Sequence, residues 1–338
     1  MKIRIAFFGA KPYDIESFEE RNKKFNFEMK FFTGTLNQNN IILTKDTDAV
    51  CIFVNDLADR AIIKTLAQNG VKIIALRCAG YNNVDLKAAY DYGVKVVRVP
   101  AYSPYAVAEH TVALMLALNR KIPRATWRTR DGNFSLNGLL GFDMHGKTAG
   151  IIGTGKIAKI LIQILRGFGV NILAYDPYPD YNFARENKVL YTTLDELYHS
   201  SDIISLHCPL TEETKYLIND YSISKMKDGV MIINTGRGQL IHTNALIDAL
   251  KNKQVGCAGL DVYEEEGEYF YEDKSESIID DDVLARLLSF NNVIVTSHQA
   301  FFTKEALANI AHTTLQNIKD FSENKKLENE VLLPEEHR

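Results

Sequence analysis

Residues 147–176 read KTAGIIGTGKIAKILIQILRGFGVNILAYD, and this stretch decides the fold. An apolar run leads to Gly153 and Gly155, a helical pattern follows, and a second apolar run ends at Asp176. The order of strand, glycine turn, helix, strand and acid is typical of a dinucleotide-binding unit. The unit begins almost halfway along the chain, so the residues before it need a role of their own.

The glycine turn matches the spacing G-x-G-x-x-G/A through Gly153, Gly155 and Ala158. The first glycine permits a tight turn, the second lets backbone approach a pyrophosphate, and the small third residue lets the helix pack on the strand. The helix N-terminus then presents amides to the phosphates. A carboxylate at Asp176 accepts ribose hydroxyls and repels a 2′-phosphate, which predicts NAD as the cofactor. The alternative is an ordinary βαβ turn followed by a surface aspartate.

Length and composition describe an ordinary globular protein. The chain has 338 residues, of which 46% are hydrophobic and 24% charged, with a formal net charge of −4. This length predicts two domains, and the charge gives no reason to expect nucleic acid or a membrane as a partner. Four cysteines without a C-x-x-C pair, together with the lack of a signal peptide or membrane span, predict a cytoplasmic protein with reduced thiols.

Apolar, β-branched runs alternate with helical patterns along most of the chain. The expected strands of a first series are KIRIAFF, FEMKFF, DAVCIFV, VKIIAL and VKVVRV. Those of a second series are TAGIIG, NILAYD, DIISLH, GVMIINT, GCAGLDV and NVIVTSH. Strands that alternate with helices favour parallel sheets. The expected fold class is therefore α/β, with two parallel-sheet domains that are Rossmann-like or flavodoxin-like.

Two helical segments fall outside this alternation. Residues 103–130 read as a long helical stretch interrupted by Pro123, and residues 303–326 read as an amphipathic helix with no strand after it. A lone final helix has to pack on another element, and we expect it to return to the first sheet. The cofactor domain is then an insertion. We expect residues 1–100 and 300–338 to form the substrate domain and residues 101–299 the NAD-binding domain.

Three strand ends in the second series carry residues suited to oxidoreduction of a small acid. Arg237 lies between two glycines just past one strand, and its planar fork suits bidentate binding of a carboxylate. His298 ends the last strand, where ligands bind in open α/β sheets, and its imidazole can give or take a proton. Asp261 and Glu266 follow a third strand, and either carboxylate can orient the histidine.

Other interpretations remain open for these residues. Arg237 can be a loop arginine that caps a carbonyl, and the acidic run EEEGE does not by itself single out Glu266. His207 competes with His298 because it also ends a strand. The remaining histidines read as core or surface residues: His110, His145, His199, His242, His312 and His337. No His/Cys spacing predicts a metal site.

Four motifs together, GTGKIAK, NTGRGQLI, GLDVYEEE and TSHQAFFT, resemble the NAD-dependent D-isomer-specific 2-hydroxyacid dehydrogenases in their order and spacing. The resemblance covers nearly the whole chain. LRCAGYNNVD and VPAYSPYAVAEHTVALMLALNRKI make it closest to the lactate branch. Ala158 stands where many members have glycine, and Gln299 follows the histidine where many have a small residue and then proline.

The resemblance also implies roles for individual residues. Arg237 binds the substrate carboxylate, His298 is the acid/base and Glu266 is the carboxylate partner of the histidine. The implied cofactor-binding residues are Gly153, Gly155, Lys156, Ile157, Asp176, Cys208, Pro209, Thr235, Gly236 and Asp261. The implied substrate-binding residues are Cys78, Ala79, Gly80, Tyr102, Arg237 and Phe301.

The activity implied by the resemblance is reversible reduction of pyruvate, or of a similarly short 2-oxo acid, to the D-hydroxy acid by NADH, with the substrate held between the domains. An enzyme for bulkier 2-oxo acids is one alternative. A non-catalytic NAD-sensing protein of the same fold is another, although an intact Arg237, Glu266 and His298 argue against it. Family likeness implies a homodimer. Residues 106–118 and the WRTR segment at 127–130 are candidate interfaces, unless the helix packs within its own chain.

Overall fold

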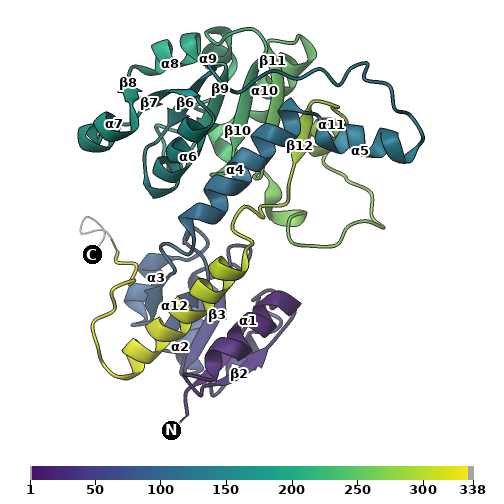
Figure 1. The fold of residues 1–338 in the computed structure, drawn as a ribbon. Helices are drawn as coiled ribbons and strands as arrows, with labels where there is room; N and C mark the ends of the chain where they lie inside the picture. The colour runs from purple at the N-terminus through teal and green to yellow at the C-terminus, as the bar shows by residue number, and fades with distance from the viewer. Residues whose placement is uncertain (1, 334–338) are drawn as a thin grey trace. The chain divides into compact units, whose positions relative to one another are not determined.

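The computed structural model describes residues 2–333, which divide into two compact units. Unit 1 comprises the residues up to Ser103 together with those from Phe302 onward, and unit 2 runs from Pro104 to Phe301. The boundaries expected from the sequence fall slightly before both of these points. Each unit has a parallel sheet with helices packed on it (Figure 1), which is the fold class expected from the alternation of strands and helices.

Unit 1 is built on a five-stranded parallel sheet in the order β2-β1-β3-β4-β5. The strands are β1 Arg4–Phe7, β2 Glu28–Phe31, β3 Ala49–Ile52, β4 Ile73–Leu76 and β5 Lys95–Val97. The helices are α1 Pro12–Asn22, α2 Arg60–Gln68, α3 Leu86–Asp91 and α12 Lys304–Ser322, with a 3-10 turn at Ile41–Thr44. This strand order is that of flavodoxin-like folds.

The last helix, α12, completes unit 1. Thr303 caps it by accepting a hydrogen bond from the Ala306 amide. The helix packs against α1 (Figure 1) and against β4, and Ser17 Oγ donates to the Leu307 carbonyl at 3.0 Å. A helix that no strand follows thus returns to the first sheet, as its amphipathic pattern predicts.

Unit 2 has a seven-stranded parallel sheet in the order β12-β11-β10-β9-β6-β7-β8. The strands are β6 Thr148–Ile152, β7 Asn171–Tyr175, β8 Val189–Tyr191, β9 Ile203–Leu206, β10 Val230–Asn234, β11 Val255–Leu260 and β12 Val293–Val295. Six of these strands follow the Rossmann order, and β12 extends it at one edge. The sequence pattern did not predict β8.

The helices of unit 2 cover both faces of this sheet. They are α4 Pro104–Asn119, α5 Ile122–Arg130, α6 Lys156–Gly167, α7 Tyr181–Asn187, α8 Leu194–Ser200, α9 Asp220–Ser224, α10 Thr243–Lys251 and α11 Asp282–Leu288, with 3-10 turns η2 Gly238–Leu240 and η3 Glu266–Glu268. Two separate apolar clusters fill the spaces beside the sheet. In α6 the buried side chains are those of Ala158, Leu161, Ile162 and Leu165, which is the spacing of one helix face.

The helical stretch expected over residues 103–130 is in fact two helices. The chain leaves α4 at Asn119, and Lys121 then adopts a left-handed φ of 51° before α5 begins. Pro123 lies in the first turn of α5, where the missing amide hydrogen is tolerated. The interruption therefore precedes the proline instead of falling on it.

Most of α4 belongs to the core of unit 2. The helix packs against α6 (Figure 1), and Ala108, Thr111 and Met115 are fully buried. Packing within the same unit therefore accounts for the apolar residues at 106–118. By contrast, Trp127 in the WRTR segment is 66% exposed.

Candidate active site

The glycine turn after β6 brings two neighbouring strands together. Gly153 has a φ of +89°, and a Cβ built on it would lie 2.5 Å from the Cys208 amide nitrogen, just past β9. No other residue fits this turn, because a side chain would collide with backbone and L residues rarely adopt this φ. β6 and β9 also mark the point where the strand order reverses, which is where open α/β sheets bind ligands.

The start of α6 fits a pyrophosphate group. Gly155 is the N-cap, and within the described chain no side chain caps the first-turn amides at Lys156 and Ile157. Nothing lies within 4 Å of the position that a Cβ would take at Gly155. Open space in front of unpaired helix amides is the arrangement that binds phosphate oxygens. Ala158 is fully buried against the sheet, so the small third position of the fingerprint serves packing.

Asp176 follows β7, and its carboxylate is held by the glycine turn. Oδ2 accepts the Thr154 amide at 2.6 Å and the Thr154 hydroxyl at 2.8 Å, while Oδ1 accepts the Tyr178 amide at 2.9 Å. Partial burial raises the pKa of this carboxyl group, but the hydrogen bonds from Tyr178 and Thr154 outweigh burial and leave the pKa lowered. The group is therefore ionised near neutral pH, and one of its roughly four acceptor positions remains for a ribose hydroxyl.

His207 and Cys208 form the opposite side of this turn. His207 Nε2 lies 2.8 Å from the Ser205 hydroxyl, and burial lowers the pKa of His207 to about 4. Burial also raises the pKa of the Cys208 thiol to about 11. Both side chains are therefore neutral at physiological pH. Pro209 is exposed, and its carbonyl accepts the Thr214 hydroxyl at 2.7 Å.

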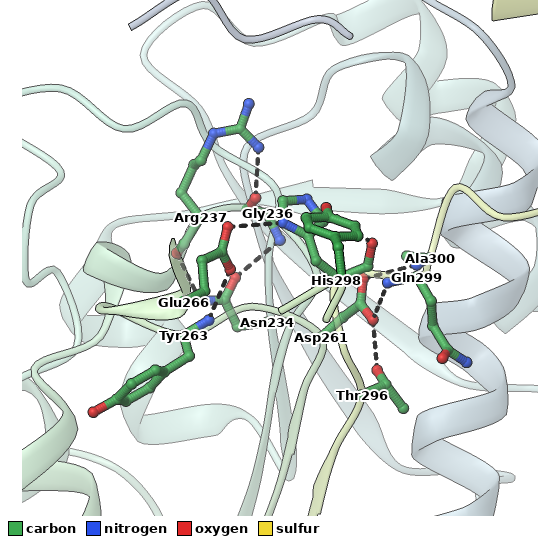
Figure 2. Close-up of polar contacts among 11 residues, drawn as sticks. Asn234, Gly236, Arg237, Asp261, Tyr263, Glu266, Thr296, His298, Gln299 and Ala300 are labelled. Atoms are coloured by element: carbon green, nitrogen blue, oxygen red, sulfur yellow. Dashed lines mark hydrogen bonds and ion pairs between the residues drawn. The ribbon is translucent and has the colours of Figure 1, made fainter. Parts of the chain in front are cut away.

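A histidine–carboxylate pair lies beyond β11 and β12 (Figure 2). His298 Nδ1 donates to Glu266 Oε1 at 2.8 Å, and Glu266 Oε2 accepts the Tyr263 amide at 3.2 Å. His298 has a left-handed φ of 53°, and its carbonyl accepts the Tyr271 hydroxyl at 3.3 Å. Since Nδ1 is bonded to the carboxylate, the other ring nitrogen, Nε2, is the one able to exchange a proton with a ligand.

The three consecutive glutamates after β11 have different partners. Glu264 Oε2 accepts the Thr243 amide at 2.9 Å, at the start of α10. Glu265 is exposed, and Glu266 alone bonds His298. Composition could not distinguish these residues, whereas the course of the backbone through η3 does.

Asp261 is completely buried and forms the turn that carries His298 (Figure 2). Its Oδ1 accepts the Thr296 hydroxyl at 2.5 Å and the Gln299 amide at 2.9 Å, and Oδ2 accepts the Ala300 amide at 2.8 Å. Its own carbonyl accepts the His298 amide at 2.8 Å. One acceptor position on Oδ2 remains.

The loop after β10 holds Arg237 (Figure 2). The Asn234 side chain bonds the Gly236 amide and the Arg237 carbonyl, at 3.0 and 2.8 Å. A Cβ on Gly238 would lie 2.0 Å from the Tyr263 carbonyl oxygen, so the second flanking glycine is required by the close approach of the two loops. The Arg237 guanidinium donates to the Gly236 carbonyl at 2.8 Å and, among residues 2–333, forms no ion pair with a carboxylate.

The remaining expected cofactor and substrate residues are divided between the two units. In unit 2, Thr235 is buried with its hydroxyl 3.0 Å from that of Thr111, and Phe301 is buried at the end of the unit. The expected substrate residues of unit 1 are Cys78, Ala79, Gly80 and Tyr102. The first three directly follow Arg77 at the end of β4.

The loop after β4 is organised to present amides. Cys78 Sγ donates to the Gly80 carbonyl at 3.3 Å, and Arg98 donates to the Ala79 carbonyl at 2.9 Å. Within the described part of the chain, the Ala79 and Gly80 amides have no acceptor. The Tyr102 carbonyl accepts the Asn309 side chain at 2.8 Å.

Sequence reasoning missed several residues that shape the site. Thr154 occupies a variable position of the fingerprint, yet it holds Asp176. Asn234 had a readable signal, since an amide side chain before a glycine turn often bonds the turn backbone. Thr296 had no such signal, because it lies past the end of β12, where the alternation of a strand no longer places side chains.

Within residues 2–333, no group of three or more His, Cys, Asp or Glu side chains could hold a metal ion. None of the helices in the same range combines the length and the apolar character that a membrane span requires.

Unit 2 thus places an open glycine turn with uncapped helix amides at one half of its carboxyl edge and a histidine–carboxylate pair at the other, an arrangement typical of dinucleotide-dependent oxidoreductases. Comparisons with known proteins narrow this class. The NAD binding domain of the D-isomer specific 2-hydroxyacid dehydrogenases matches residues 112–300.

Similar proteins match over nearly the full chain. A 2-hydroxyacid dehydrogenase homolog of Haemophilus influenzae is 54% identical over 330 residues, covering 98% of this chain and 99% of the relative. The D-lactate dehydrogenase of Escherichia coli is 51% identical over 330 residues, which cover 98% of this chain and 100% of that protein. A solved structure described as the pyruvate reductase of Chlamydomonas reinhardtii superposes with a TM-score of 0.93 at 45% identity. The match covers 97% of this chain and 98% of that structure.

The chain belongs to the D-isomer specific 2-hydroxyacid dehydrogenase family. It is an NAD-dependent oxidoreductase, as the glycine turn and Asp176 predict from the sequence.

Proposed function

We propose that the chain catalyses the reversible reduction of pyruvate to D-lactate with NADH. The observation that carries the proposal is the 2.8 Å contact between His298 Nδ1 and Glu266 Oε1, with Arg237 unpaired with any described carboxylate in the adjoining loop. A 2-oxo acid needs one group to bind its carboxylate and another to protonate its carbonyl oxygen, and these residues supply both. The two relatives described as acting on lactate or pyruvate support this choice of substrate.

Arg237 binds and orients the substrate in this proposal. Its guanidinium fork matches a carboxylate bidentately, and the amides of Ala79 and Gly80 are further donors for the same group. Tyr102 and Phe301 are the residues proposed to contact the short side chain. A carboxylate fixed at one end places the 2-carbonyl in one orientation, which is the main contribution of binding to the rate.

His298 moves the proton. During reduction the Nε2 proton passes to the carbonyl oxygen, and during oxidation Nε2 takes the hydroxyl proton. Glu266 accepts from Nδ1, which fixes the ring orientation and favours the charged imidazolium. Asp261 holds the His298 backbone turn, so the ring keeps its place through both directions of the reaction.

NAD(H), when bound, supplies or accepts the hydride. The residues that would hold it are the amides at the start of α6 and Gly155 for the pyrophosphate, and Asp176 for the adenosine ribose. Cys208, Pro209, Thr235, Gly236 and Asp261 are the remaining proposed contacts. We propose that unit 2 is the cofactor domain and unit 1 the substrate domain.

The experiment that tests the activity is NADH oxidation followed by absorbance, with pyruvate and with a series of 2-oxo acids of increasing side-chain size. We expect pyruvate to have the highest kcat/KM of the series, and chiral chromatography to identify the product as D-lactate. A maximum at a branched acid would reassign the substrate, and absence of turnover with every acid would reject the dehydrogenase activity.

We also propose that the protein is a cytoplasmic homodimer. None of the four cysteines forms a disulfide within residues 2–333, as expected for a reducing compartment. The segment after α4 exposes a group of large apolar side chains, Trp127, Phe134, Leu136 and Leu140, at 66–88%. Such a group is typical of a subunit interface.

Light scattering after gel filtration tests the dimer. Trp127→Glu combined with Leu140→Glu should give a monomer, because both changes place a charge in the proposed interface. Leu190→Glu, at an exposed apolar residue of β8, is the matched control and should leave the mass unchanged. A wild-type monomer would reject the interface.

A further inference from the structure

Two consecutive polar side chains of α4 reach the catalytic edge of the sheet. His110 Nε2 lies 3.1 Å from the Thr296 hydroxyl, and the neighbouring Thr111 hydroxyl lies 3.0 Å from that of Thr235. The helix around them is apolar and packs in the core. Thr296 follows β12 and Thr235 follows β10, so these contacts fasten α4 to the strand ends that carry His298 and Arg237.

The proton positions along the first of these contacts can be assigned. The Thr296 hydroxyl has one hydrogen, and it donates this hydrogen to Asp261 Oδ1 at 2.5 Å. The hydroxyl oxygen is then the acceptor toward His110, so His110 Nε2 carries a hydrogen. The same nitrogen lies 3.4 Å from Asp261 Oδ1. His110 thus completes a chain of donors that ends on a carboxylate with no exposure to solvent.

Asp261 transmits this contact to the acid/base. Its carboxylate accepts the Gln299 and Ala300 amides, and its carbonyl accepts the His298 amide. These bonds hold His298 in the left-handed conformation, which non-glycine residues adopt only when their surroundings require it. A carboxylate free to rotate would loosen the turn, and the His298 ring would lose its alignment with Glu266.

We propose that His110 is a positioning residue for the acid/base His298, acting through Thr296 and the buried Asp261. The inference builds on the proposed function, since it assigns His298 the proton transfer. It adds a residue that the sequence pattern places among core histidines. His110 itself touches neither the substrate nor the cofactor in this proposal.

The test compares two replacements of His110. His110→Phe keeps a ring in the core but has no donor, whereas His110→Gln keeps an N–H at similar reach. We expect His110→Phe to lower kcat about tenfold, the scale of one hydrogen bond, and to move the fall of the reduction rate with rising pH to lower pH. His110→Gln should restore most of the rate and the pH profile. An equal loss in both variants would overturn the proposal.

A double-mutant cycle shows whether the effect passes through Thr296. His110→Phe and Thr296→Val should each reduce the rate, and the double variant should be little worse than either single one, because all three break the same chain. If the fold-changes of the two single variants instead multiply in the double variant, the effect of His110 does not pass through Thr296 and the proposal is wrong. Val112→Ala is the control for lost packing, since it truncates a buried residue of the same helix. It should lower the unfolding temperature without moving the pH profile.

A second readout needs no substrate. The NMR signal of the His298 Nδ1 proton in the resting protein, which reports its hydrogen bond to Glu266, should shift and broaden in His110→Phe but not in His110→Gln, because a misaligned ring loses that bond. An unchanged signal in His110→Phe would sink the positioning role even if pyruvate proved not to be the substrate. An inactive wild type whose signal still changes in His110→Phe would instead reject only the proposed function.

Discussion

The carboxyl edge of the sheet in unit 2 has two regions, and each contains a strand-end histidine. The cofactor region follows β6, β7 and β9 and includes His207, whereas the catalytic region follows β10, β11 and β12 and includes His298. His207 bonds a serine hydroxyl, and burial lowers its pKa to about 4. His298 bonds the Glu266 carboxylate at 2.8 Å. Two histidines in equivalent positions thus have different chemistry because their partners differ.

The two regions also differ in how they are assembled. The glycine turn and Asp176 of the cofactor region come from one continuous βαβ unit, and Asp176 bonds Thr154 within it. The catalytic region joins three loops that are separate in sequence, with Asn234, Asp261 and Glu266 fixing them. A local unit is easily recognised in the sequence, while a region built from distant loops depends on packing. The following predictions test this contrast.

The largest effect is expected for His298→Ala. General acid–base catalysis typically contributes about 10²–10⁴-fold, so kcat should fall on that scale. Reduction needs the imidazolium and oxidation the neutral ring, so wild-type reduction should fall as pH rises and oxidation should fall as pH drops. Steady-state rates in both directions across pH give the measurement. A variant that kept most of its rate would show that the two regions do not divide the work as proposed.

Arg237→Lys should have the next largest effect. Lysine keeps the charge but not the planar fork, and misplacement of the substrate by about 1 Å can reduce the rate about 10²-fold. We expect kcat/KM for pyruvate to fall on that scale, with NADH affinity, measured by fluorescence titration, little changed. Normal pyruvate kinetics would remove Arg237 from the carboxylate-binding role.

Glu266→Gln should cause a moderate loss together with a shifted pH profile. The amide still accepts from His298 Nδ1 but no longer carries the charge that favours the imidazolium. We expect kcat for reduction at neutral pH to fall about tenfold, the value of one hydrogen bond to a charged group, and the reduction limb to move to lower pH.

Glu265→Gln is the matched control for this variant, because Glu265 is exposed beside it in the same acidic run. It should leave both the rate and the profile unchanged. If the pH profile shifted in Glu265→Gln but not in Glu266→Gln, the carboxylate partner of His298 would be another glutamate.

Asp176→Ala tests the cofactor region. It should change the preference for NADH over NADPH more than it changes the rate with NADH. The pKa of Asp176 is lowered, because hydrogen bonds from Tyr178 and Thr154 outweigh the partial burial that raises it. The ionised group should repel a 2′-phosphate, so we expect the wild type to prefer NADH clearly. The variant should use NADH less well and narrow the gap to NADPH without binding NADPH strongly, since no arginine replaces the carboxylate. Equal use of both cofactors by the wild type would contradict the assignment.

The smallest effect is expected for His207→Gln. The pKa of His207 is lowered from its ordinary value of 6.5 to about 4, so the ring stays neutral across the pH range of activity. Neither limb of the pH profile should move. A depressed histidine pKa means that the unfolded chain binds a proton more readily, so wild-type stability should fall as pH drops from about 6.5 to about 4. In thermal unfolding, the variant should lose less stability than the wild type over this pH window. A shift in either limb of the pH–rate profile would instead place His207 in the proton transfer.

Much of the fold could be read from the chain. Apolar runs with turn residues between them indicated all strands of both sheets except β8, an edge strand that buries none of its three residues fully. The break between α4 and α5 was misplaced onto Pro123, because a proline at a helix start looks the same in sequence as one that interrupts a helix. The interior position of α4 was not readable either, since an apolar helix suits a core and an interface equally.

The sequence by itself determined the parallel α/β class, the glycine turn at Gly153 and the acid at Asp176, because each depends on the order of residues within one local unit. It also placed Arg237 and His298 at strand ends. Family resemblance pointed to Glu266, but only the tertiary structure shows that this glutamate meets His298, that Asp261 holds the turn beneath it, and that His110 reaches Asp261 through Thr296. These choices depend on which loops pack together at one edge of a sheet, and hydrogen-bond geometry over a few ångströms separates side chains that share the same composition.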